Sequence, residues 1–223
     1  MTPVEIQHHF HVRPLLRGIS HLVSFPIMVI LGGCLLVFAD LSATAFALIL
    51  LYVLGTVTMF GVSALYHRGR WSPETRALMQ RFDRTAIFLA IAGGYTPVIV
   101  LCLDGWWQWG IVITVWVGSA IGVLLHWIPS IPRGYRGASY ILVSWTAIVA
   151  VPSLWNGLGP LGFSLILAGG VCYTLGAIAL AARWPDPWPK VFGFHEVFHA
   201  FTVVAAGLQY AAIAGIVAPR LTA

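Results

Sequence analysis

Histidines at positions 195 and 199 open a long apolar stretch, FHEVFHAFTVVAA, near the end of this 223-residue chain. Residues four apart stack on one face of a helix, so both imidazoles would point the same way. His67 closes an earlier apolar stretch, and three neutral imidazoles with an open fourth position form a typical catalytic zinc site. Imidazole also suits copper, iron and nickel, so the pattern predicts a metal site with zinc as the preferred ion.

A carboxylate and a hydroxyl accompany the imidazoles. Asp83 begins the next apolar stretch, and Ser63 lies one helical turn before His67 on the same face. A zinc ion lowers the pKa of a coordinated water to about 7. Asp83 could hold that water and take its proton, and Ser63 could hydrogen-bond the water or a developing oxyanion. The alternatives are an ion pair of Asp83 with Arg81 or Arg84, and a bond from Ser63 to its own helix backbone.

The elements that must position these side chains are membrane helices. Hydrophobic residues make up 59% of the chain and charged residues 9%, whereas soluble domains carry about 25% charged residues. The net charge is +5, but with so few charged residues it does not indicate a surface that binds nucleic acid. Stretches of about 17–24 apolar residues are long enough to cross a bilayer. The sequence predicts a single all-α membrane domain over residues 1–223, a bundle of seven transmembrane helices at about 19–38, 43–66, 82–102, 107–125, 138–155, 160–182 and 195–217.

The basic residues predict the orientation, because cytoplasmic loops carry an excess of Lys and Arg. One side of the predicted bundle holds Arg13, Arg17, Arg68, Arg70, Arg76, Arg81, Arg133, Arg136, Arg183 and Lys190. The other side holds Arg220, with Arg84 left aside at a helix end. The N-terminus is therefore predicted to be cytoplasmic and the C-terminus outside. The stretch 71–81, WSPETRALMQR, is predicted to be a short amphipathic helix on the inner surface, capped by Ser72.

With this orientation, the candidate site residues share one depth at the cytoplasmic ends of spans two, three and seven. Ionisable groups within a span are costly and usually face the bundle interior, so the shared depth favours a common site. The remaining histidines are predicted to lie outside it. His21 and His126 are expected to be interfacial residues, and a solvated tail is expected to hold His8, His9 and His11.

The sequence HEVFH is also a literal H-E-x-x-H, in which Glu196 would be the general base of an intramembrane metalloprotease. After His199 the chain holds no Asp, Glu or His that could act as a third ligand. The nearest upstream acid in a loop is Asp186, which precedes the motif. The protease is therefore an alternative with an incomplete ligand set.

Three blocks of the chain resemble the signature blocks of the hemolysin III family: SALYHR (63–68), FDRTAIFLAIAGGYTP (82–97) and HEVFHAFTVVAA (195–206). That family belongs with the progestin and adipoQ receptors and the alkaline ceramidases. The resemblance implies zinc bound by His67, His195 and His199, with Asp83 and Ser63 as polar companions. Many bacterial members resemble Asp-His-Ser where this chain has Asp83-Arg84-Thr85.

The favoured function is a zinc-dependent hydrolase of a lipid amide or ester, because the resemblance includes ceramidase-like relatives. Its partners would be membrane lipids rather than nucleic acid, and its location the inner (plasma) membrane of a bacterium. A second possibility is a non-catalytic protein, a sensor or a pore-forming haemolysin, in which zinc only clamps helices together.

Overall fold

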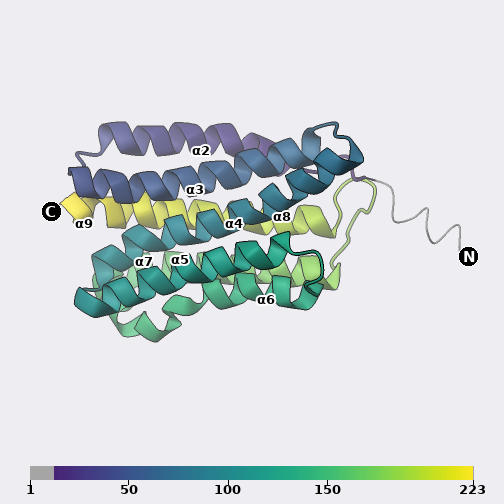
Figure 1. Ribbon diagram of the computed structural model, residues 1–223. Coiled ribbons are helices and arrows are strands. Elements are labelled where there is room, and N and C mark those ends of the chain that lie inside the picture. Colours follow the sequence, from purple (N-terminus) through teal and green to yellow (C-terminus); the bar gives the residue numbers. More distant parts are fainter. Residues whose placement is uncertain (1–12, 223) are drawn as a thin grey trace, which may run out of the picture.

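The computed structural model describes residues 13–222, and within this range the chain is helical without strands, apart from an isolated bridge between Trp188 and Phe192. The helices lie side by side in an elongated bundle, and the C-terminal helix ends at the opposite end from the first described residues (Figure 1). Their bounds are α2 Ile19–Phe38, α3 Ala43–Arg68, α4 Pro73–Cys102, α5 Gly105–Trp127, α6 Arg133–Ser144, the 3-10 turn η1 Thr146–Ala150, α7 Val151–Ala182, α8 Phe194–Ala212, the π-helical turn η2 Ile213–Val217 and α9 Ala218–Thr222.

Six helical segments of the described chain are long and apolar enough to cross a membrane. Many large apolar side chains point outward, among them Phe38 and Leu142, as expected where lipid rather than water surrounds the bundle. The predicted all-helical membrane class is confirmed. By length and composition, Arg133–Ala182 is one of these six segments and has 50 residues. The sequence instead predicts two spans in this region, 138–155 and 160–182.

This long segment is broken at Gly159, whose φ of 69° and ψ of 173° are not helical. Glycine adopts such a positive φ without the strain that a Cβ would cause. A Cβ at Gly157 would lie 2.6 Å from the sulfur of Cys102, so this turn sits beside the C-terminal end of α4. Gly176, farther along α7, packs against Phe198 in the first turns of α8.

Helix α4 begins earlier than the sequence predicts. The Ser72 hydroxyl caps it by accepting the N–H of Thr75 at 3.3 Å, and Pro73 occupies the first turn. The predicted cap is therefore confirmed, but the separate surface helix over 71–81 is wrong. Because no Gly or Pro interrupts residues 74–92, that stretch continues into the membrane as part of one 30-residue helix. Asp83 consequently lies within α4 rather than at its start.

Glycines bring α3 and α4 into close contact. A Cβ at Gly55 would lie 2.6 Å from the carbonyl oxygen of Leu89, and one at Gly93 would lie 2.5 Å from that of Leu51. Membrane helices use such small residues to let backbones approach. This packing determines how α3, which carries Ser63 and His67, lies against α4, which carries Asp83.

Candidate metal centre

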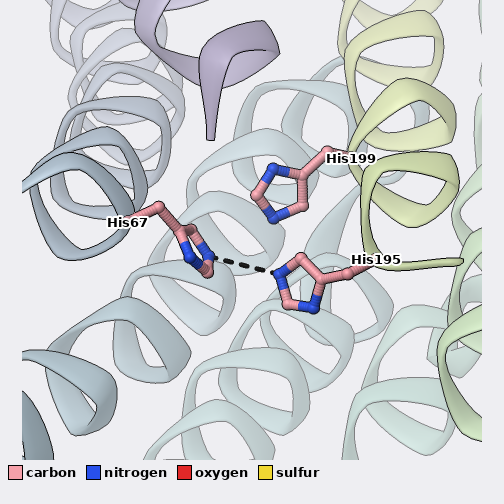
Figure 2. A group of neighbouring side chains, drawn as sticks. All are labelled: His67, His195 and His199. Carbon is pink, nitrogen blue, oxygen red and sulfur yellow. Dashed lines mark hydrogen bonds between the residues drawn. The ribbon is translucent and has the colours of Figure 1, made fainter. Parts of the chain in front are cut away.

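The structure brings together three imidazoles from two helices. His67 comes from the last turn of α3, and His195 and His199 come from the first turns of α8 (Figure 2). One ring nitrogen from each lies within 4.8 Å of the others, and the Nε2 atoms of His67 and His195 are 3.2 Å apart. His67 and His199 are buried, and His195 is partly buried. The predicted juxtaposition across more than 120 residues of sequence is present.

The start of α8 is held by acidic side chains that accept backbone N–H groups. Glu196 accepts the N–H of Gly193 at 2.9 Å, and Asp186 accepts the N–H of Phe194 at 2.9 Å. The first N–H groups of a helix have no partner within it, so these bonds define where α8 begins. They determine the place at which His195 and His199 enter the bundle.

Asp83 and Ser63 lie beside the imidazoles. An Asp83 carboxylate oxygen is 4.0 Å from Nε2 of His67, and the Ser63 hydroxyl is within hydrogen-bonding reach of the same carboxylate. A separation of 4.0 Å is too long for a hydrogen bond. Among the ion pairs of residues 13–222, none joins Asp83 to Arg81 or Arg84, so the alternative of a local ion pair is not observed.

His21 also belongs to this cluster, although the sequence predicts it to be interfacial. Its ring stacks on that of His199, with centroids 3.8 Å apart and planes 6° from parallel, and the side chain is 3% exposed. The interfacial prediction is wrong because α2 packs its first turn into the bundle instead of against lipid headgroups. The sequence held one signal for this: His21 lies at the predicted cytoplasmic end of its span, as the other site histidines do, and this could have placed it in the cluster.

Arg17 and Glu196 form an ion pair next to the site. The Arg17 Nε donates to the Glu196 carboxylate at 2.5 Å, and Glu196 is 3% exposed. This contact joins the segment before α2 to the first turn of α8. The carboxylate of the H-E-x-x-H sequence is thus engaged by Arg17 and by the Gly193 N–H. Spacing alone did not predict this pairing, since 179 residues separate the partners.

The segment before α2 covers His67 closely. Gly18 has a φ of +76°, and a Cβ there would lie only 2.4 Å from the Cβ of His67. The N–H groups of Leu15 and Leu16 donate to the carbonyl groups of Lys190 and Val191 at 3.0 and 3.1 Å. The segment before α2 is therefore hydrogen-bonded to the connection between α7 and α8, and it lies over the end of the bundle that carries the histidines.

His126 is the other histidine predicted to be interfacial, and it is also buried, at 5% exposure. Its Nδ1 bonds to the carbonyl oxygen of Gly122 at 2.8 Å, and its ring packs against Phe88 and Tyr140. A structural role inside the bundle replaces the interfacial prediction. The predicted tail histidines, His8, His9 and His11, lie outside the described residues.

The residues present fit a metal ion. Neutral imidazole is a ligand of zinc and of several transition metals. The 3.2 Å between His67 and His195 is close to the separation of two nitrogens on a tetrahedral zinc, about 3.3 Å for bonds of 2.0–2.1 Å. The Nδ1 atom of His199 is buried and has no hydrogen-bond partner among the described residues. This group of side chains could hold a metal ion.

Comparison with known proteins gives one consistent answer over nearly the whole chain. Residues 10–210 match the family described as Haemolysin-III related. The chain is 32% identical over 208 residues to "Hemolysin-3" of Bacillus cereus, covering 91% of this chain and 89% of the relative. It is 27% identical over 198 residues to "Hemolysin-3 homolog" of Bacillus subtilis (strain 168), covering 87% of each.

Proposed function

We propose, from the premise that this chain belongs to the Haemolysin-III related family, that it is a zinc-dependent hydrolase of a lipid amide or ester. The observation that carries the proposal is the buried group of His67, His195 and His199 beside the Asp83 carboxylate. The chain is a membrane protein. Its Bacillus relatives support placing it in the cytoplasmic membrane of a bacterium.

Seven crossings are part of this proposal, with the N-terminus in the cytoplasm. Support comes from the course of the segment 133–182. The Tyr140 hydroxyl donates to the Arg84 carbonyl at 3.3 Å, near the histidine end, whereas Gly157 lies beside Cys102 at the other end of α4. After the break at Gly159 the chain returns, and Gly176 packs against Phe198. The distribution of Arg and Lys favours a cytoplasmic histidine end.

The chemistry follows from the residues around the cluster. When bound, zinc acts as a Lewis acid and lowers the pKa of a coordinated water. Asp83 is suited to accept the proton of the attacking water, since its oxygen lies 4.0 Å from Nε2 of His67 and is therefore close to the place where that nitrogen would hold the ion. Ser63 lies within reach of the Asp83 carboxylate and is suited to orient it. The outward apolar surface is suited to contact with membrane lipids.

The Asp83→Asn variant tests this proposal, because it keeps the shape of the side chain and removes the base. Zinc content should remain near one per chain. Hydrolysis of a lipid amide, such as a ceramide in mixed micelles, should fall by ~10²–10⁴, the usual contribution of general acid–base catalysis. The double variant H195A/H199A supplies the metal-free baseline, since one imidazole cannot hold the ion tightly.

A structural clamp is the second candidate, favoured by one observation: the three imidazoles come from two helices, α3 and α8, which an ion would hold together. In a clamp, Asp83→Asn would lower zinc affinity or the melting temperature, and the parent protein would hydrolyse no lipid. Zinc retained together with a loss of hydrolysis would exclude the clamp.

The names of the two Bacillus relatives say haemolysin, which leaves a pore-forming role to be tested. Release of a trapped dye from vesicles by the purified protein would support it. The protease alternative is the least favoured, because Arg17 and Gly193 engage the Glu196 carboxylate.

A further inference from the structure

His21 is a buried imidazole whose two ring nitrogens are both without a hydrogen-bond partner among the described residues. It lies in the first turn of α2, it is 3% exposed, and its ring contacts the rings of His199 and Phe60. Phe60 meets it edge to face at a centroid distance of 5.0 Å, and His199 stacks on it at 3.8 Å. Neither neighbour gives His21 a hydrogen-bond partner.

Such an arrangement is unfavourable unless a further group completes it. A neutral imidazole carries one donor and one acceptor, and burial of either without a partner is costly. His126 in the same bundle shows the ordinary solution, since its Nδ1 bonds to the Gly122 carbonyl. His199, on which His21 stacks, has an unpartnered nitrogen as well. The unsatisfied nitrogens thus concentrate at the three-histidine cluster.

The stacking geometry argues against His21 as a ligand of the same ion. A metal binds an imidazole nitrogen in the plane of the ring. The rings of His21 and His199 are within 6° of parallel and 3.8 Å apart, so an ion in the plane of His199 lies well outside the plane of His21. The position of His21 is better suited to a hydrogen bond with an oxygen atom that is itself bound to the ion.

We infer that His21 hydrogen-bonds the non-protein oxygen ligand at the open position of the three-histidine site, either water or the carbonyl oxygen of an amide or ester. The inference rests on the proposed metal site and adds a binding residue to it. His21 N–H would donate to that oxygen, and the stack on His199 would hold the ring in place. Because this ligand comes from outside the protein, the donating nitrogen has no partner among the described residues.

The test uses the full-length protein in detergent with cobalt in place of zinc, because the visible spectrum of cobalt reports its ligands. Acetohydroxamate, an oxygen-donor probe, is titrated into the parent and into His21→Phe. Phenylalanine keeps an aromatic ring on His199 and removes both nitrogens. We expect one cobalt per chain in both proteins and about tenfold weaker acetohydroxamate binding in the variant, as for one lost hydrogen bond. His21→Gln should recover part of the affinity, since its amide can donate.

The control is His126→Phe, a matched change of another buried histidine, which should bind cobalt and acetohydroxamate like the parent. Unchanged acetohydroxamate affinity in His21→Phe would overturn the inference, and so would loss of cobalt from a folded His21→Phe. If His21→Phe fails to fold, His21→Leu replaces it, since leucine also lacks a hydrogen-bonding group, and unchanged acetohydroxamate affinity would again overturn the inference. A parent that binds no metal overturns both this inference and the proposed function. If the parent binds cobalt but hydrolyses no lipid, the hydrolase proposal is overturned and the inference about His21 is not.

Discussion

At the residue scale, the partner of a side chain decides its role more than its place in a motif. Glu196 stands at the second position of H-E-x-x-H, where a metalloprotease would have its base. Its carboxylate instead accepts from Arg17 and from the Gly193 N–H, and it is almost fully buried. We therefore expect Glu196 to position the first turn of α8, and with it His195 and His199.

Replacing Glu196 by Ala or Gln tests this role. Ala removes both contacts, and breaking a buried ion pair from one side should lower the free energy of unfolding by about 3 kcal/mol. Metal affinity should fall about tenfold with it, because coordination and folding of the site are coupled. Gln keeps an acceptor for Gly193 and should lose less. The measurements are thermal unfolding and metal binding.

Glu74→Gln is the matched control, because Glu74 lies exposed in the first turn of α4. It should leave metal affinity and stability near parent values. A Glu196→Gln protein with normal stability and normal metal content, yet without peptide-bond hydrolysis that the parent performs, would restore the metalloprotease interpretation.

At the element scale, the site depends on how closely α3 approaches α4. The carbonyl oxygen of Leu51 occupies the space that a side chain at Gly93 would need. The carbonyl oxygen of Leu89 does the same at Gly55. The contact sets the position of His67 and Ser63 relative to Asp83, which the 4.0 Å separation from His67 reflects. A substitution that moves α3 and α4 apart should therefore weaken metal binding, although the substituted residue lies several helical turns from the site.

Adjacent glycines of α4 provide the test. Gly93→Ala places a Cβ 2.5 Å from a backbone oxygen, whereas a Cβ at Gly94 meets its nearest neighbour at 3.9 Å. Overpacking of this kind costs about 1–3 kcal/mol. Gly93→Ala should unfold more readily in a denaturant titration and bind metal more weakly, and Gly94→Ala should resemble the parent. Equal behaviour of the two variants would show that α3 and α4 tolerate separation.

At the scale of the whole molecule, the number of crossings decides on which side the C-terminus lies. A break at Gly159 that turns the chain back gives an odd number, whereas a single crossing by Arg133–Ala182 gives an even one. The loop between α3 and α4 lies at the histidine end in either arrangement. The two arrangements therefore differ in a property that reporters can measure.

Reporter fusions should find the C-terminus outside the cell. Alkaline phosphatase fused after Ala223 should be active, and a fluorescent protein inserted in the loop 69–72 should fluoresce in the cytoplasm. A phosphatase fused at Gly157, next to the break, should also be active. An inactive phosphatase at Ala223 together with a cytoplasmic loop 69–72 would reduce the count to an even number.

The sequence by itself determined the helical membrane class and the expectation that the candidate site residues share one depth. Length, apolar composition and the i, i+4 spacing of His195 and His199 are local properties, so they can be read along one chain. Depth can be compared between helices because the bilayer imposes a common axis on all of them. This is why the meeting of His67 with His195 and His199 was predictable without a structure.

Only the tertiary structure decided what faces what at that depth. It places His21 on His199, pairs Arg17 with Glu196, and packs His126 against Tyr140. These contacts depend on the rotation of each helix about its own axis and on which helices are neighbours. In a chain with lipid around it, apolar residues cover the outer and inner faces alike, so the hydrophobic pattern carries little information about rotation. Packing of small residues and bonding of buried polar groups fix the rotation instead.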